Sequence, residues 1–157
     1  MARWQDIERA APAVAEGGQQ LLYQFGIGLG YLATVGPDGT PRVHPFCPII
    51  EGGGLYGFIV PSPKRRDLYR SGRFAIHSFP MEDRDDEFFC SGAAQRELDA
   101  STNERVLAKY RADGGDSSPG EELFEFEPER ALLARYKARG EPDNWPPDYL
   151  RWMAAAN

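Results

Sequence analysis

The stretch from Gly39 to Leu68 constrains the fold more than any other part of the chain. Two apolar runs of strand length, 42–50 and 55–60, lie on either side of three consecutive glycines, which predicts a β-hairpin. The second run leads directly into the sequence PSPKRR and a predicted short helix over 64–70. The hairpin therefore places the Ser62 hydroxyl and the cations of residues 64–66 at the start of a helix. This arrangement is typical of an anion site and indicates a nucleotide-like cofactor.

Length and composition narrow the class of protein. The 157 residues, 1–157, are expected to form a single domain that buries roughly 70% of its unfolded surface. Two cysteines are typical of a reduced cytosolic domain, and the first residues lack the pattern of a signal peptide. The sequence has no apolar run near the roughly 20 residues that a membrane span requires. We therefore expect a cytoplasmic protein with no membrane partner, and the net charge of −6 argues against nucleic acid as a partner.

A local positive region interrupts this acidic chain. Residues 64–73 carry five basic side chains against one acid, Asp67. A small basic region on an acidic protein fits a small anionic ligand better than a polyanion. The alternative interpretation is a solvated helix face with no ligand.

Turn residues and apolar patterns divide the domain into helices over 1–25, a barrel with inserted helices over 26–137, and a tail over 138–157. Pro12 and the pair Gly17-Gly18 are expected to separate two N-terminal helices. Short strands joined by tight turns predict a mainly β fold, an antiparallel barrel with flanking helices. The expected strands are 27–35, 42–50, 55–60, 74–79, 87–98, 123–127 and 131–137, and a second inserted helix runs from a cap at Ser101 to about Tyr110.

Proline and glycine mark special positions in these strands. Three prolines between 41 and 48 cannot donate to a ladder, so this strand is expected at a sheet edge or beside a ligand. Its alternation places His44 and Phe46 on one face. Gly92 is expected to form a bulge, and Pro128 to separate the last two strands.

Four segments in this order and spacing resemble one known family. LATVGPDGTPRVHP, LYGFIVPSPKRRDL, GRFAIHSF and DDEFFCSGAA are similar to the pyridoxamine 5'-phosphate oxidase-like family of FMN-binding split β-barrels. The resemblance covers roughly residues 21–98. It implies an antiparallel split β-barrel of the FMN-binding type and a homodimer with the cofactor at the subunit interface. Some branches of the family bind the deazaflavin F420 instead of FMN, and a few bind haem.

The resemblance also implies a set of cofactor-binding residues. The isoalloxazine ring is expected to lie along His44, Pro45, Phe46 and Cys47, and the ribityl chain over Ile59 and Val60. The phosphate is expected at Ser62 and Lys64, with Arg65 as an additional candidate. Apart from the resemblance, Trp145 of the tail can offer the ring a flat apolar wall.

The phosphate end of this site has the clearest physical basis. Ser62 and Lys64 match the family's phosphate-binding Ser-x-Lys, and Arg65 is an additional candidate. A flavin phosphate is a dianion, and each charge-assisted hydrogen bond to it is worth roughly 1.5–3 kcal/mol. The sequence departs from the family pattern at His44, where a stronger base is common, and at Pro63, where a second cation is common.

The function indicated is an FMN-dependent oxidoreductase that acts on a small organic substrate. The alternatives are an F420-dependent reductase and a non-catalytic protein that binds flavin, F420 or haem. The tail YLRWMAAAN lacks the Arg-Leu-containing substrate motif of true pyridoxine-phosphate oxidases, so that activity is not expected. The catalytic residues stay unassigned, because the flavin carries the redox chemistry. The histidines and cysteines lack the spacing of a metal site, and His77 is expected to be a strand residue with a hydrogen-bonded ring.

Overall fold

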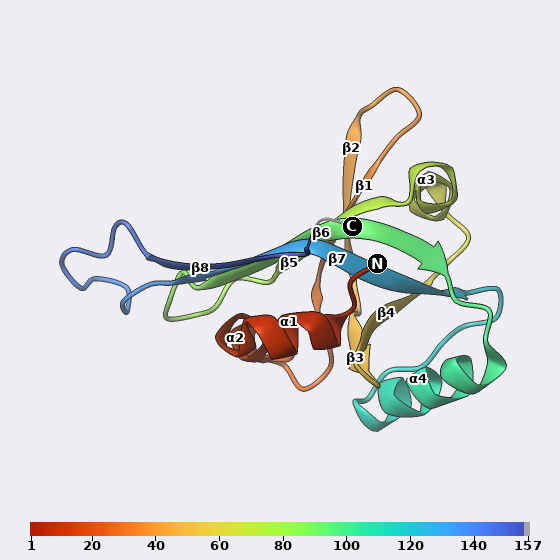
Figure 1. The fold of residues 1–157 in the computed structure, drawn as a ribbon, viewed down its shortest axis with the longest axis horizontal. Coiled ribbons are helices and arrows are strands. Elements are labelled where there is room, and N and C mark those ends of the chain that lie inside the picture. Colours follow the sequence, from red (N-terminus) through yellow and green to blue (C-terminus); the bar gives the residue numbers. More distant parts are fainter. Residues whose placement is uncertain (156–157) are drawn as a thin grey trace.

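A curled antiparallel sheet forms the centre of the molecule in the computed structural model, which describes residues 1–155 (Figure 1). The strands are hydrogen-bonded in the order β2-β1-β5-β6-β7-β4-β3, and β8 pairs with β7. The fold is therefore mainly β, an antiparallel half-barrel with flanking helices, as the sequence predicts. The strands are β1 Gly30–Val35, β2 Pro41–Phe46, β3 Ile49–Glu51, β4 Gly54–Ile59, β5 Arg73–Ser78, β6 Glu87–Arg96, β7 Glu122–Arg135 and β8 Asp148–Met153, and the helices are α1 Trp4–Ala10, α2 Pro12–Leu22, α3 Pro63–Ser71 and α4 Ala100–Ala112.

The curl of the sheet follows from the connection between β2 and β3. These strands lie at opposite ends of the sheet order, yet only Cys47 and Pro48 separate them in the chain. The two edges must therefore approach each other. The prediction of one continuous strand over 42–50 is wrong, because the chain leaves one edge after Phe46 and joins the other at Ile49. Pro48 has no N–H to continue the ladder at this break.

The first two helices cover the apolar face of the sheet. Trp4 packs edge-on against Phe88, with 5.7 Å between the ring centroids. Pro12 begins α2, as expected, but the glycine pair lies inside that helix and does not divide it. A Cβ atom added at Gly18 would lie 2.6 Å from the Phe88 ring. The pair therefore allows α2 to approach the sheet closely.

Strands β6 and β7 form the longest pairing in the sheet, and a bulge interrupts it. The register shifts between Ser91 and Gly92, where the bulge was predicted, but the extra residue is Glu129 of β7 and not Gly92 of β6. The prediction that Pro128 separates two strands is wrong, because β7 is continuous through it. Pro128 lies opposite Gly92 at the irregularity. A bulge tolerates a proline because the ladder is already disrupted there.

The remaining elements complete the outside of the sheet. Helix α4 packs over a second apolar cluster that includes Tyr56 and Val106. Its cap is Asp99, which accepts a hydrogen bond from the Thr102 amide at 2.8 Å, and not the predicted Ser101.

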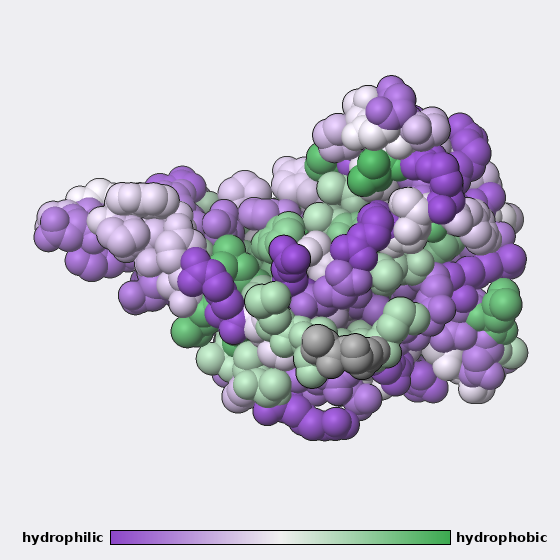
Figure 2. All heavy atoms as spheres, turned by 45° about the horizontal axis from the view of Figure 1, so that its top comes forward, coloured by the Kyte–Doolittle hydropathy of each residue, from purple (hydrophilic) through white to green (hydrophobic). Residues whose placement is uncertain are grey.

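The tail contains a strand that the sequence analysis did not predict. Strand β8 pairs with the second half of β7, and the loop between them forms an arm that projects from the body (Figure 1). Figure 2 shows mostly hydrophilic and intermediate residues on this arm. None of the described helices is both long and apolar enough to span a membrane.

Candidate functional site

The corner between β4 and α3 forms the centre of the predicted site. Ser62 is the N-cap of α3, and its Oγ accepts a hydrogen bond from the Arg65 amide at 3.4 Å. The same hydroxyl donates to the Val60 carbonyl at 2.9 Å. Pro63 follows as the first helical residue, where a missing N–H costs nothing. A serine cap followed by proline explains why the helix begins here.

Lys64 is a half-buried cation at the start of this helix. Burial lowers the pKa of its ammonium group, and the charge of Glu121 offsets this in part. Lys64 forms no ion pair with any residue in the described part of the chain. Its position at the positive end of the helix dipole adds a further unfavourable interaction. The Lys64 ammonium is therefore free to bind an anion.

Arg65, in contrast, is already paired. Its Nη1 donates to the Gly120 carbonyl at 2.8 Å, and its Nε lies 3.5 Å from Oε2 of Glu122. Glu122 also lies 3.3 Å from Arg96 and accepts a hydrogen bond from the Tyr69 hydroxyl. Arg65 therefore joins the start of α3 to the segment that enters β7.

His44 lies on the neighbouring strand β2 with a nitrogen that has no partner. Its Nε2 is buried and forms no hydrogen bond within residues 1–155. Arg42 is on the same face of β2 and donates to Asp67 of α3 at 3.0 Å. His44 therefore lies on the strand face that carries the contact with α3. A buried polar atom without a protein partner costs free energy, so this nitrogen is available to accept or donate a hydrogen bond to a ligand.

The second half of α3 is a closed network around Asp67. This buried carboxylate accepts hydrogen bonds from Thr34 Oγ1 at 3.0 Å, from Arg42 at 3.0 Å and from Arg70 at 3.1 Å. Burial opposes its ionisation, but these hydrogen bonds and the two positive charges outweigh burial and lower the pKa of Asp67. A hollow of about 370 Å³ lies beside the network, and the exposed Arg66 lines it.

The other predicted residues of this corner are placed in different ways. Phe46 and Ile59 are 7% and 0% exposed and belong to the core, so they offer almost no surface to a ligand. Pro45 is exposed, Cys47 is half-buried and Val60 is 39% exposed. These three side chains are open to a bound molecule.

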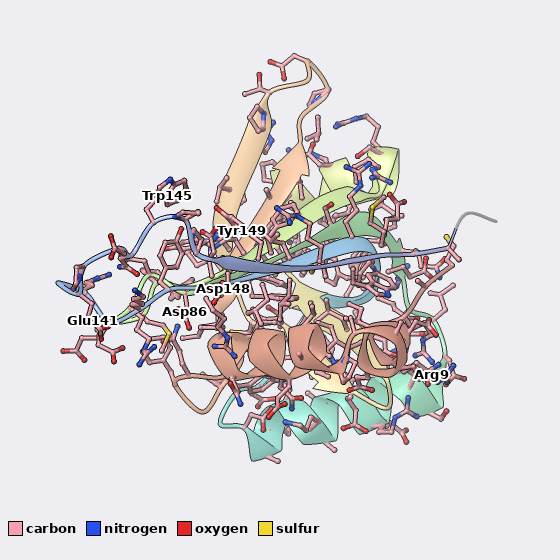
Figure 3. All side chains as sticks on the ribbon, turned by 60° about the vertical axis from the view of Figure 1, so that its left-hand side comes forward. Arg9, Asp86, Glu141, Trp145, Asp148 and Tyr149 are labelled. Carbon is pink, nitrogen blue, oxygen red and sulfur yellow. The ribbon has the colours of Figure 1, made fainter. Side chains whose placement is uncertain are left out.

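Trp145 is not brought to this corner within one chain. It is 72% exposed and lies on the arm between β7 and β8. Figure 1 shows the arm and α3 at opposite ends of the molecule, and Figure 3 shows Trp145 beyond the end of the body.

The structure brings His77 and Glu87 together on the adjacent strands β5 and β6. Nδ1 of His77 lies 2.7 Å from the Ser78 carbonyl, so this nitrogen donates, and Nε2 lies 3.3 Å from Oε2 of Glu87. The expected hydrogen-bonded ring of His77 is therefore confirmed. A hollow of about 270 Å³ borders the pair and also includes Tyr31. Within residues 1–155, His, Cys, Asp and Glu side chains form no group of three or more that could hold a metal ion.

Solved structures share this arrangement of strands at low sequence identity. A putative pyridoxamine 5'-phosphate oxidase from Listeria innocua is 21% identical with a TM-score of 0.58, and the match covers 78% of this chain and 95% of that one. A Clostridium acetobutylicum protein related to general stress protein 26, of the pyridoxinephosphate oxidase family, is 11% identical with a TM-score of 0.62, covering 90% and 94%. The haem storage protein HutZ of Vibrio cholerae is 20% identical with a TM-score of 0.59, covering 76% and 89%.

The chain has the split-barrel fold of these proteins. No family model matches the sequence, and no curated protein matches it. The likeness therefore extends to the fold, and the neighbours that share it include both oxidase-family and haem-binding proteins.

Proposed function

We propose that the protein binds FMN with its phosphate at the start of α3 and acts as a flavin-dependent oxidoreductase on a small organic substrate. Lys64 carries this proposal. A half-buried ammonium group without a counter-ion, at the positive end of a helix, is unfavourable by itself. A phosphate dianion would remove this cost by supplying the missing charge.

The surrounding residues fit the same group. The unpartnered Nε2 of His44 can form a hydrogen bond to a phosphate or to the ribityl chain. Ser62 can contribute only if its hydroxyl turns away from the Val60 carbonyl, and Arg65 only if it leaves Glu122. Bound flavin would supply the redox chemistry, and the protein would supply binding and orientation.

We also propose a homodimer with the cofactor at the interface. Large apolar side chains are exposed, including Val43 at 62% on β2 and Trp145 at 72% on the arm. Apolar surface of this kind favours association. The arm projects away from its own α3, so a tryptophan contact with the cofactor would have to come from the partner. Sedimentation is expected to give about twice the chain mass of 17.5 kDa at micromolar concentration.

The second candidate is a non-catalytic protein that binds haem, F420 or flavin. The observation that favours haem is again the free imidazole nitrogen of His44, because a histidine is a common axial ligand of haem iron. The haem storage protein among the structural neighbours has the same fold.

Titration of the cofactor-free protein with FMN, F420 and haem separates these functions. Fluorescence and absorbance are expected to show micromolar binding of FMN, ahead of F420 and haem. Turnover of the reduced cofactor with an electron acceptor supports the oxidoreductase, and tight binding without turnover supports the second candidate. If none of the three compounds binds at micromolar concentration, both the oxidoreductase and the cofactor-binding function are contradicted.

A further inference from the structure

A second cavity lies away from α3, where the two ends of the described chain meet. Its volume is about 620 Å³, larger than either hollow near the candidate site. This size is within the range of about 300–1,000 Å³ found for small-molecule pockets. Met1 and Ala2 line it together with Ala154 and Ala155, and Figure 3 shows Arg9, at the rim of this cavity, far from Trp145. Its walls include Ala2, Asp6, Arg9, Glu127, Trp152 and Met153.

Glu127 in the wall of this cavity is a buried carboxylate with an unsatisfied oxygen. The residue is 8% exposed. Its Oε1 accepts a hydrogen bond from Gln95 at 3.1 Å, but its Oε2 is buried without a partner among the described residues. Burial and then the charge of Glu125 raise the pKa of Glu127, and the charges of the Met1 amino group and of Arg3 offset this only in part.

Comparison with its neighbours along β7 shows what Glu127 lacks. Glu125 accepts a hydrogen bond from Arg3 at 2.7 Å. Glu129 accepts two hydrogen bonds from Arg73, at 2.7 and 2.9 Å. The carboxylate between these two forms no ion pair within residues 1–155, and Arg9 at the rim lies 3.6 Å from Asp6.

The rest of the cavity wall suits an apolar body. Trp152 and Met153 contribute an aromatic and a flexible sulfur-containing side chain, and several alanines add apolar surface between the charged residues Asp6, Arg9 and Glu129. The Trp152 indole lines the same cavity as Glu127 and can bind a cation through its ring face. The terminal torsion of a glutamate is soft, so Oε2 can turn toward the cavity at little cost.

We propose that this cavity binds an organic cation, a primary amine or guanidinium on an apolar body, with Glu127 as its counter-ion and Trp152 as its apolar wall. This site is separate from the proposed flavin site, because its walls include no residue of α3 or β2. The proposal does not depend on flavin binding.

Three matched probes test the charge requirement by calorimetry: 3-phenylpropylamine, 3-phenylpropan-1-ol and 3-phenylpropionate. The amine is expected to bind at millimolar concentration or below, with the alcohol about tenfold weaker or more and the carboxylate undetectable. Addition of the amine is also expected to shift the indole NMR signal of Trp152. No amine binding, or equal affinity for the amine and the alcohol, would overturn the proposal.

Variants then test the counter-ion. Glu127→Gln keeps the shape of the side chain and is expected to weaken amine binding about tenfold or more, with alcohol binding unchanged. It is expected to fold, because a neutral amide is easier to bury than a carboxylate without a counter-ion. Glu104→Gln, on the exposed surface of α4, removes the same charge and is expected to bind the amine like the wild type.

An unchanged amine affinity in Glu127→Gln, or an equal loss in Glu104→Gln, would contradict the assignment. FMN affinity measured on the same variants distinguishes this site from the flavin site, and Glu127→Gln is expected to leave it unchanged. If Glu127→Gln does not fold, Trp152→Phe provides the test. It keeps an aromatic wall with a weaker affinity for cations, so only amine binding is expected to weaken.

Discussion

The two halves of α3 carry the same kind of charge, but the structure uses them differently. In the second half, Arg70 is held by the buried carboxylate of Asp67, together with Arg42 from β2. In the first half, Arg65 is paired with Glu122, but Lys64 and Arg66 form no ion pair with any described residue. The difference shows that a cluster of basic residues does not by itself mark a ligand site. Cations that lack a counter-ion within the protein are the ones available to a ligand.

The largest expected effect of a single substitution is on stability, and it comes from the second half of α3, where Asp67 holds Arg70. Asp67→Asn leaves two arginines without their counter-ion and is expected to lower the free energy of unfolding by about 3 kcal/mol at neutral pH. Because the folded-state pKa of Asp67 is lowered, the stabilisation is present above its unfolded pKa and is lost as the pH falls through the folded value.

Urea unfolding of wild type and Asp67→Asn at pH 7 and in acid measures this effect. The two proteins are expected to differ at pH 7 and to converge as the pH falls through the folded-state pKa of Asp67, which lies below its unfolded value. A wild type and a variant of equal stability at pH 7 would show that the network contributes nothing.

The next largest effect is expected on FMN affinity, and it comes from Lys64 in the first half of α3. Lys64→Ala is expected to weaken FMN binding by about ten- to a hundredfold, since it removes a charge-assisted bond worth roughly 1.5–3 kcal/mol. Its free energy of unfolding is expected to stay close to that of the wild type, because the ammonium has no partner to lose. Lys64→Arg is expected to lose less affinity.

Arg70→Ala is the matched control and is expected to show the reverse pattern. It loses its bond to Asp67, so stability falls while FMN affinity changes little. Equal small losses of affinity in Lys64→Ala and Arg70→Ala, both abolished by moderate salt, would support a solvated basic face instead.

A smaller effect is expected at His44. His44→Leu removes a buried nitrogen that has no partner, so the free energy of unfolding is expected to stay the same or rise by about 1 kcal/mol. FMN affinity is expected to fall by roughly three- to tenfold, the value of one ordinary hydrogen bond. Chemical unfolding tests the expected stability, and FMN titration tests the expected loss of affinity. A loss of stability in His44→Leu would show that His44 has a structural partner.

The smallest effect is expected at Arg66, which is exposed beside the hollow next to Asp67. Arg66→Ala is expected to change stability by less than about 0.5 kcal/mol and FMN affinity by less than about fivefold. Repeating the titration at higher salt is expected to abolish the difference from wild type. A loss as large as that of Lys64→Ala would place the phosphate nearer to Arg66.

The sequence predicts most of the fold because its signals are local. Pro12 marks the start of α2, and Gly92 marks the point in β6 where the pairing with β7 is irregular. The errors arise where distant parts of the chain decide the outcome. Gly17 and Gly18 resemble a helix break, but they lie inside α2 because Leu133 and Phe88 pack against them.

The same limit applies to the candidate site. The order Ser62-x-Lys64 is visible in the sequence, and the structure places it at the start of α3. The partners that occupy Arg65 come from residues more than fifty positions away, so its pairing could not be predicted. Glu127 gives no sequence signal at all, because its lack of a partner is a property of the folded chain.

The affinity ratio between FMN and riboflavin tests the phosphate site most directly, since the two ligands differ only in the phosphate group. The wild type is expected to bind FMN about ten- to a hundredfold more tightly than riboflavin, and in Lys64→Ala this ratio is expected to approach one. Riboflavin affinity itself is expected to be the same in both proteins. A wild type that binds the two flavins equally, or a ratio that survives in Lys64→Ala, would contradict a phosphate site at the start of α3.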